Sequence, residues 1–346
     1  MNRLIYLIKR VVHLDYSNMF KIAKSVSKKA KKNTFFIILD MIYCGIVYQA
    51  GYYDYQEFEF YNLNRAERKT YLTRGKNNEI VRLFNDKNYF HSFENKVEFN
   101  KIFSKFLKRD WMFLSNNVDE FVMFFKSHNN IIVKPIDSTG GNGVEKYTYT
   151  NEVDAHTLYN KLIENNQLLI EEYINQHPDM TTLYDASVNT LRLFTFYKDG
   201  QVYFLQAILK IGNGGVIDNF SGGGMYTYVD ENGTVFVEAI DKNDNVYYTH
   251  PISHTQIVGF KVPLFQEAIE LVKECAKVIP EVAYVGWDVA ISKDGPVLVE
   301  GNCFPGVYQV KPSLSNKKEG LISKYRKIMN IFWYSLFFIL IFYFFF

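Results

Sequence analysis

Two carboxylates and an amide late in the sequence have the spacing of a metal site. Asp288 lies in one apolar run, Glu300 ends the next, and Asn302 follows two residues later. The turn residues 293–295 between the runs predict an antiparallel hairpin. Asp288 and Glu300 are 12 residues apart and symmetric about position 294, so we expect them to face each other across the hairpin. Glu300 and Asn302 share a face because side chains alternate along a strand.

Three oxygen ligands at one place predict a site for Mg²⁺ or Mn²⁺. Two carboxylates that face each other repel, and a bound cation removes that repulsion. Hard oxygen ligands are the ones these two ions prefer. The alternative is three unrelated polar side chains at the end of a hairpin. The apolar residues that flank Asp288 and Glu300 favour the metal site.

A glycine-rich segment, residues 137–144, forms a second candidate site. It follows a short β-branched strand that ends in Lys134 and Pro135. Glycines let backbone N–H groups approach phosphate oxygens, and a lysine places a point charge on a phosphate. The segment lacks the G-x-x-x-x-G-K-[ST] pattern of a Walker A loop. An ordinary hairpin turn is the alternative.

Charged residues in later strands suit the same kind of ligand. The strand expected at 168–174 turns from apolar to acidic at Glu171 and Glu172. In a linker between two lobes, the backbone of such a strand would pair with an adenine edge, and an amphipathic strand end is the alternative. Arg192 and Lys210 project from two further strands, where they would clamp a phosphate or a carboxylate. Each also has a simpler interpretation as a surface charge.

The elements that must position these residues indicate an α+β fold. Strands with few crossover helices between them predict largely antiparallel pairing, which excludes a regular doubly wound sheet. Helical periodicity stands out in three segments, and turn residues separate the strands. The expected helices are 97–111, 154–165 and 262–278, and the expected strands are 131–135, 146–150, 168–174, 190–197, 202–211, 226–238, 284–292 and 296–300.

The composition is that of a globular protein, and the cysteine content fits a reducing compartment. The 346 residues are 48% hydrophobic and 22% charged, and the net charge of +2 makes a nucleic-acid partner unexpected. Three cysteines, Cys44, Cys275 and Cys303, form no C-x-x-C pair, so neither zinc nor a disulfide framework is expected. The first residues do not have the pattern of a signal peptide.

Segments at both ends of the sequence suggest that the protein associates with a membrane. Residues 1–32 hold nine Lys and Arg against one acid and predict one or two basic amphipathic helices, either an ordinary surface helix or a helix attracted to anionic lipid. Residues 328–346 contain no charge and would span about 28 Å as a helix. Basic residues before this tail favour a C-terminal anchor with the body on the cytoplasmic face. A frame-altered or unstructured end is the alternative.

Together these segments resemble the ATP-grasp superfamily, and in particular its sugar-transfer-associated branch, sometimes labelled hexapeptide-transferase-family protein. The resemblance runs from about residue 37 to about residue 313. Its most specific part is the trio Asp288, Glu300 and Asn302 with spacing of 12 and then 2. One departure is Asn100 before Lys101, where many ATP-grasp enzymes have aspartate.

The resemblance implies ATP bound between two α+β lobes. Lys101 and Lys134 would reach the phosphates. Residues 138–143, including Ser138, Gly141 and Gly143, would cover them. Glu171, Glu172 and Ile174 would hold the adenine, with Asp179 as the candidate for the ribose. Arg192 and Lys210 would lie near the transferring phosphate, with Asn219 as a polar contact.

The resemblance also implies a domain division and a reaction. The expected parts are a basic helical segment (1–32), a mixed helical region (33–99), an N-terminal lobe (100–175), a C-terminal lobe with the metal (176–315), and a basic linker with the hydrophobic tail (316–346). The expected reaction is ADP-forming ligation of a carboxylate to an amine or hydroxyl through an acylphosphate, in cell-surface polysaccharide synthesis. A sugar or lipid-linked sugar kinase and a non-catalytic nucleotide-binding membrane protein are the alternatives.

Overall fold

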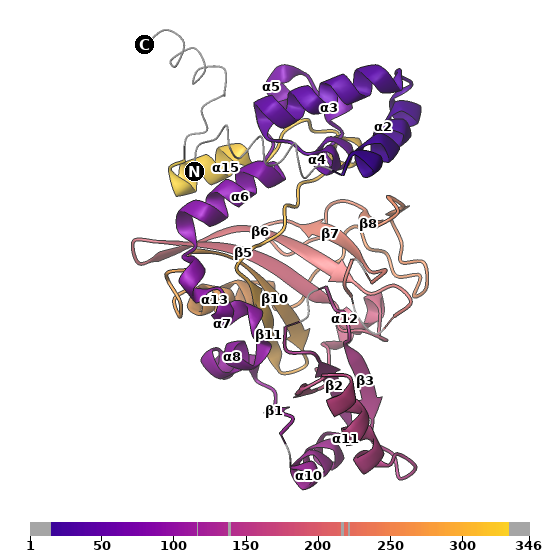
Figure 1. Ribbon diagram of the computed structural model, residues 1–346, viewed down its shortest axis with the longest axis vertical. Helices are drawn as coiled ribbons and strands as arrows, with labels where there is room; N and C mark the ends of the chain where they lie inside the picture. Colours follow the sequence, from indigo (N-terminus) through magenta and orange to yellow (C-terminus); the bar gives the residue numbers. More distant parts are fainter. Residues whose placement is uncertain (1–14, 116, 138–139, 216–217, 221, 332–346) are drawn as a thin grey trace. The chain divides into compact units, whose positions relative to one another are not determined.

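The computed structural model describes residues 15–115, 117–137, 140–215, 218–220 and 222–331. The chain divides into two compact units. The helical unit contains residues 1–83 and 306–346, and the two-sheet unit contains residues 84–305 (Figure 1). The predicted domain boundaries at residues 32, 99, 175 and 315 stay a prediction. The two compact units are defined by how the chain packs and not by these functional parts. Residues 1–14 and most of the hydrophobic tail lie outside the described residues.

In the helical unit, short polar caps set where the helices begin. The Asp15 side chain accepts a hydrogen bond from the N–H of Asn18 and starts α2, and Asn33 caps α3 through the N–H of Phe35. Helix α2 buries Ile22, Ala23 and Val26, as its amphipathic pattern predicts. The helices are α2 (Tyr16–Ala30), α3 (Thr34–Tyr48), α4 (Tyr52–Glu57), α5 (Arg65–Arg68), α6 (Arg74–Phe84), α14 (Pro312–Ser315) and α15 (Ile322–Met329), with a 3₁₀ turn at Phe60–Asn62.

A half-buried ion pair connects the helices of this unit. Arg68 donates to both carboxylate oxygens of Asp40, at 2.7 and 2.6 Å, and to the carbonyl of Phe60. The Tyr55 hydroxyl donates to the same carboxylate at 2.7 Å. Burial opposes the charge of Asp40, but its bonds from Arg68 and Tyr55 outweigh burial and lower its pKa. The bidentate geometry therefore fixes α3 against α5.

The last described residues fold onto the first part of the chain. The Gln309 side chain donates to the carbonyl of Leu72 at 2.7 Å and accepts from its N–H at 2.9 Å. Farther along, the Ser313 hydroxyl donates to Glu59 at 2.6 Å, and the N–H of Ile322 donates to the carbonyl of Thr70. The helical unit is thus built from two separate stretches of sequence.

The two-sheet unit contains a small four-stranded sheet with two helices packed on it. The strand order is β1-β4-β2-β3, and all pairs are antiparallel. Helices α10 and α11 lie beside this sheet (Figure 1) and bury Phe121, Phe125 and Leu158 in a shared core. The elements are β1 (Trp111–Phe113), α10 (Val118–His128), β2 (Asn130–Lys134), β3 (Glu145–Thr148), α11 (Ala155–Glu164) and β4 (Leu169–Glu172).

The larger sheet has seven antiparallel strands in the order β11-β10-β5-β6-β7-β8-β9. Its core face packs on several helices, among them α8 and α13. The strands are β5 (Thr190–Lys198), β6 (Gln201–Ile211), β7 (Met225–Val229), β8 (Ala239–Asp241), β9 (Val246–Tyr247), β10 (Tyr284–Ser292) and β11 (Gly295–Asn302). The helices are α7 (His91–Glu94), α8 (Lys96–Ile102), α9 (Ser104–Leu107), α12 (Pro178–Leu183) and α13 (Phe265–Cys275), with a 3₁₀ turn at Lys87–Tyr89.

The α+β prediction with antiparallel strands is confirmed, and two predicted elements differ. The helix expected at 97–111 is broken at Phe103, which caps α9 with a non-helical backbone and buries its ring against Phe99 and Trp287. The strand expected at 226–238 ends at Val229, because a turn at 230–233 folds the chain back. In both cases tertiary packing or turn geometry outweighs periodicity. Among the described residues, no helix has the length and apolar content needed to cross a bilayer.

Lys76 in α6 makes the stability of the helical unit depend on pH. Its side chain is buried and donates to the carbonyl of Tyr71, and burial together with Arg326 lowers its pKa to about 7. The unfolded chain keeps this proton to about pH 10, so it binds more protons than the folded chain between those values. We expect the free energy of unfolding to rise with pH there by up to about 1.4 kcal/mol per pH unit.

Urea denaturation from pH 6.5 to 9.5 measures this slope. Lys76→Met should flatten it, whereas Lys69→Met, at an exposed position in the same unit, should leave it unchanged. Equal slopes in the wild-type and Lys76→Met proteins would contradict the assignment.

Candidate active site

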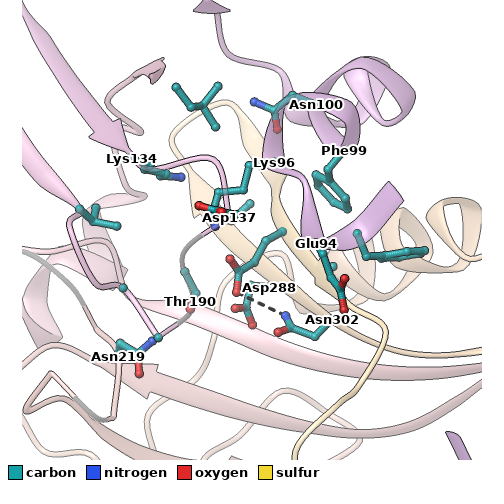
Figure 2. A pocket seen from close by; sticks show the side chains of 18 of the residues that line it. Glu94, Lys96, Phe99, Asn100, Lys134, Asp137, Thr190, Asn219, Asp288 and Asn302 are labelled. Atoms are coloured by element: carbon teal, nitrogen blue, oxygen red, sulfur yellow. Dashed lines mark hydrogen bonds between the residues drawn. The ribbon is translucent and has the colours of Figure 1, made fainter. Parts of the chain in front are cut away.

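One cavity of about 610 Å³ in the two-sheet unit collects most of the chemistry-bearing residues. Its walls come from the small sheet, the larger sheet and the segment around α7 and α8 (Figure 2). The charged and amide residues that line it are Glu94, Lys96, Asn100, Lys134, Asp137, Glu171, Lys210, Asp218, Asn219, Asp288, Glu300 and Asn302.

Alternation along three strands decides which side chains face this cavity. On β10, Trp287 and Val289 belong to the core, so Asp288 between them faces the opposite side. On β5, Leu191 and Leu193 belong to the core, so Arg192 between them also faces away from it. The neighbours of Lys210 on β6 are also core residues. The three charged residues therefore share one face of the sheet.

An extra residue in β11 places Glu300 opposite Asp288. Near the turn, Ser292 pairs with Gly295 and Val289 with Leu298, a register that would place Val299 opposite Asp288. The register shifts by one residue at this point, so Asp288 pairs with Glu300. Such a β-bulge puts two consecutive residues, Val299 and Glu300, on the cavity side. The predicted cross-strand pair is confirmed, although the turn is centred between residues 293 and 294.

Asp288 is held by two cations from neighbouring strands. Arg192 donates to both of its carboxylate oxygens, and the Lys210 ammonium lies 2.7 Å from Oδ2. Burial alone would raise the pKa of Asp288, but Arg192 and Lys210 outweigh burial and hold it well below its usual range. Burial likewise opposes the charge of Lys210, and Asp288 outweighs it and raises the Lys210 pKa. All three groups are therefore charged at neutral pH.

The pKa of Glu300 shifts in the opposite direction to that of Asp288. Burial and the facing Asp288 raise its pKa, although 43% of the Glu300 side chain is accessible. Its contact with Arg192 is long, at 3.8 Å, and Asn302 donates to Glu300 Oε1 at 3.3 Å. Figure 2 shows Asn302 beside Asp288 with this hydrogen bond dashed. Among the described residues its only ion pair is this long one, and a carboxylate so placed beside a second carboxylate and an amide oxygen fits a divalent metal ion. The ligand roles of the three residues stay a prediction.

Glu171 joins three elements from the small-sheet side. Its carboxylate accepts from Lys134 at 2.5 Å, from Arg109 at 2.7 Å and from Asn100 at 2.8 Å. Burial opposes its charge, but Arg109 and Lys134 outweigh burial and keep its pKa far below the usual value. Arg109 also donates to the carbonyls of Leu298 and Val299, next to the β11 bulge. Glu171 therefore holds the Lys134 ammonium at the cavity wall.

Lys96 is a cavity residue that sequence reasoning missed. It is the first residue of α8, capped by Asn95, and it lines the cavity together with Lys134 (Figure 2). Burial and the nearby charge of Lys134 lower its pKa, whereas Glu300 raises it. Lys101 lies five residues later on the same helix, about 140° around it, where it is exposed and does not line the cavity. The Asn-x-x-Glu cap signal at residues 95–98 was available in the sequence.

Asn219 reaches the cavity from a compact loop after β6. Asp218 accepts hydrogen bonds from the N–H and the hydroxyl of Thr190, at 2.9 and 2.5 Å. The Asn219 carbonyl accepts from the N–H groups of Gly222 and Gly224, at 3.0 Å each. A Cβ on Gly224 would lie 2.2 Å from the Asp218 carbonyl oxygen, so this close turn requires glycine.

The structure brings together some of the predicted site residues and not others. Eight line the cavity and Arg192 contacts Asp288 directly; the eight are Lys134, Gly141, Glu171, Lys210, Asn219, Asp288, Glu300 and Asn302. Lys101, Gly143, Glu172, Ile174 and Asp179 do not line it. Ser138 lies outside the described residues.

Local geometry explains why Glu172 and Asp179 do not line the cavity. Glu172 follows Glu171 by one residue, so it faces the other side of the sheet and accepts from the N–H of Asp110 at 3.2 Å. Asp179 lies in the first turn of α12, exposed beside His177. Their predicted contacts with adenine and ribose stay predictions without support from this cavity.

Comparison with known proteins decides the family. The profile described as sugar-transfer associated ATP-grasp matches residues 66–330, more than three quarters of the chain. The chain belongs to this family. The predicted ATP-grasp family and fold of this protein are thereby confirmed. A search of curated proteins finds no significant match.

Solved structures of ATP-grasp ligases are distantly similar to this ATP-grasp protein. D-alanyl-alanine synthetase A from Vibrio cholerae is 14% identical with a TM-score of 0.42, over 69% of this chain and 64% of its own. D-alanine–D-alanine ligase from Bacillus anthracis is 15% identical with a TM-score of 0.40, over 74% of both chains. The ATP-grasp ligase PsnB, complexed with a precursor peptide and AMPPNP, is 11% identical with a TM-score of 0.42, over 77% and 68%. The chain thus spans less than two thirds of the first structure.

Lys96 and Lys101 make a matched pair for testing the cavity. Removing a cavity cation should weaken anion binding, so we expect Lys96→Met to lower the affinity for a non-hydrolysable ATP analogue by about tenfold or more. Lys101→Met should change it by less than about twofold, because its exposed ammonium does not face the cavity. Isothermal titration measures both affinities. A larger loss of affinity for Lys101→Met than for Lys96→Met would support the sequence-based prediction that Lys101 binds the phosphates.

Glu171 and Glu172 make a second matched pair. Glu171→Gln leaves the buried Arg109 and Lys134 without a counter-charge, and we expect it to lower the free energy of unfolding by about 3 kcal/mol. Glu172→Gln lies on the other face and should cost less than about 0.5 kcal/mol. Urea denaturation at neutral pH gives both values, and equal losses would argue against a central role for Glu171.

Proposed function

We propose that this ATP-grasp protein is an ADP-forming ligase that joins a carboxylate to an amine or a hydroxyl. The observation that carries the proposal is the arrangement of charge in one cavity. Lys96, Lys134 and Lys210 line the same space as the oxygen donors of Glu300 and Asn302. A polyanion bridged to a metal ion is the ligand such a mixture suits.

The proposed roles follow from the position of each side chain. Lys96 and Lys134 bind the phosphates of ATP, since both side chains line the cavity that also holds Glu300 and Asn302. Asp288, Glu300 and Asn302 would hold Mg²⁺ or Mn²⁺. When bound, that ion would neutralise the negative charge of the phosphates while the phosphoryl group is transferred. Lys210 and Arg192 orient Asp288 and add positive charge near the transferring group.

The proposed reaction has two steps. A carboxylate oxygen of the substrate attacks the γ-phosphorus, the bond to the β-phosphate oxygen breaks, and ADP leaves with an acylphosphate formed. An amine or hydroxyl then attacks the acyl carbon, releasing phosphate and one proton. Arg192 and Lys210 would stabilise the oxygens that gain charge in the first step, with Asn219 as a polar contact.

The biological setting is a separate proposal. The family description contains sugar transfer, which supports a role in cell-surface polysaccharide or glycan synthesis, with a sugar amine or hydroxyl as acceptor. We place the enzyme at the cytoplasmic face of the membrane, attached through the uncharged segment 328–346 and the basic residues 1–32. A nucleic-acid partner is not part of this proposal.

Hydroxylamine trapping tests the reaction class. With ATP, Mg²⁺ and a panel of amino acids and nucleotide sugars, the protein should release ADP and give a hydroxamate when hydroxylamine is present. Glu300→Gln should reduce ADP release by about a hundredfold or more, because it removes a metal-facing carboxylate. Asp294→Asn, at the exposed tip of the same hairpin, should leave the rate unchanged.

Two outcomes would contradict the ligase. A stable phosphorylated product without hydroxamate would indicate a kinase. ATP binding without turnover, unchanged by Glu300→Gln, would indicate a non-catalytic nucleotide-binding protein.

A further inference from the structure

Helix α3 presents an apolar face to solvent. Six large side chains on this face are between 36% and 67% exposed. They recur at the spacing of successive helical turns, so they form one continuous stripe. The residues of this stripe are Phe35, Phe36, Leu39, Ile42, Tyr43 and Ile46.

The opposite face of α3 is already used by the core of the helical unit. Ile37, Met41, Cys44 and Tyr48 are buried there. The charged residue of the helix, Asp40, is paired with Arg68 between the two faces. A helix that is apolar all round is normally covered on every side. The outer stripe therefore needs a partner.

Charge is divided between the two units of the chain. Residues 1–83 and 306–346 contain 21 Lys and Arg and 8 Asp and Glu, a net charge of +13. Residues 84–305 contain 18 Lys and Arg and 29 Asp and Glu, a net charge of −11. The overall charge of +2 hides this asymmetry. A basic unit of this kind favours an anionic surface as its partner.

Basic residues stand next to the apolar stripe. Helix α2, which lies beside α3 (Figure 1), exposes Lys21, Lys24 and Lys28 on its solvent side. From α5, the Arg65 guanidinium lies over the Tyr43 ring, 6.0 Å from its centroid. An apolar stripe bordered by cations is the pattern of an interfacial helix.

We propose that the outer face of α3 docks onto an anionic lipid bilayer, with the lysines of α2 at the level of the headgroups. Helix α3 has 15 residues and is about 22 Å long, too short to span the hydrocarbon core, so it lies in the plane of the interface. The site is distinct from the uncharged segment 328–346 and does not depend on the ligase reaction.

Charge favours a bilayer over a second copy of the chain. Pairing two α3 faces would bring two lysine-rich α2 helices together and repel them. An anionic lipid surface neutralises the same charges and accepts the apolar stripe at once.

A probe placed on the stripe tests the site itself. The native cysteines are buried, and burial raises the pKa of Cys44 to about 12, so a new surface cysteine can be labelled selectively. We would attach an environment-sensitive fluorophore to Ile42→Cys in the full chain. The matched control is Met123→Cys, 66% exposed on α10 of the other unit.

Vesicles of phosphatidylcholine with about one third phosphatidylglycerol should shift the emission of the probe at position 42 to the blue and leave position 123 unchanged. Pure phosphatidylcholine should give a much smaller shift. An unchanged signal at position 42 while the protein sediments with vesicles would overturn the proposal. So would a signal at 42 that is already blue-shifted without lipid, or that depends on protein concentration alone, since the stripe would then be covered by the chain or by a second copy.

Substitution of the stripe provides an independent measurement. Leu39→Gln, Ile42→Gln and Ile46→Gln together keep good helix formers on the exposed face. They should lower partition into the anionic vesicles by about tenfold or more while the unfolding midpoint is retained. Met123→Gln with Ile163→Gln, two exposed apolar residues elsewhere, should leave partition unchanged. Unchanged partition of the triple variant would overturn the proposal, whereas loss of ligase activity alone would not.

Discussion

A single additional residue in one strand determines whether Asp288 and Glu300 face each other in the cavity. Without the bulge at Val299, the alternation of β11 would turn Glu300 toward the core and leave a valine facing Asp288. The bulge costs part of the strand ladder, and neighbouring groups compensate for it. Arg109 donates to the carbonyls of Leu298 and Val299 at that place. One arginine thus supports both the irregular strand and the Glu171 carboxylate.

Charge in the cavity is arranged so that cations and anions hold one another before any ligand arrives. Asp288 is paired with Arg192 and Lys210, and Glu171 with Arg109 and Lys134. Glu300, by contrast, has one long ion pair, to Arg192 at 3.8 Å, and a raised pKa. Buried pairs of this kind are costly to form but rigid once formed, so Asp288 and Glu171 are held in fixed positions, and Glu300 is the carboxylate whose charge responds most to a bound cation.

Sequence patterns predict local relationships well and distant ones poorly. The facing of Asp288 and Glu300 follows from a short turn and strand alternation, which need only neighbouring residues. Lys101 was predicted from the family resemblance alone, and the angle around a helix that separates it from Lys96 matters only once the position of the cavity is known. The partners of Glu171 lie between 37 and 71 residues away in the sequence, so no local pattern indicates them. The exposed stripe of α3 looks in sequence like any buried helix.

The helical unit is assembled from both ends of the chain, and this has a consequence for synthesis in the cell. Leu72 acquires its partner Gln309 only after the whole two-sheet unit has been translated. Glu59 and Thr70 likewise wait for Ser313 and Ile322. A truncated chain that stops after the two-sheet unit therefore lacks part of its helical unit even though every residue of its cavity has been made. Complete packing of the helical unit therefore requires translation to pass Ile322, and until then the surfaces that these late residues cover stay open to solvent and to proteases.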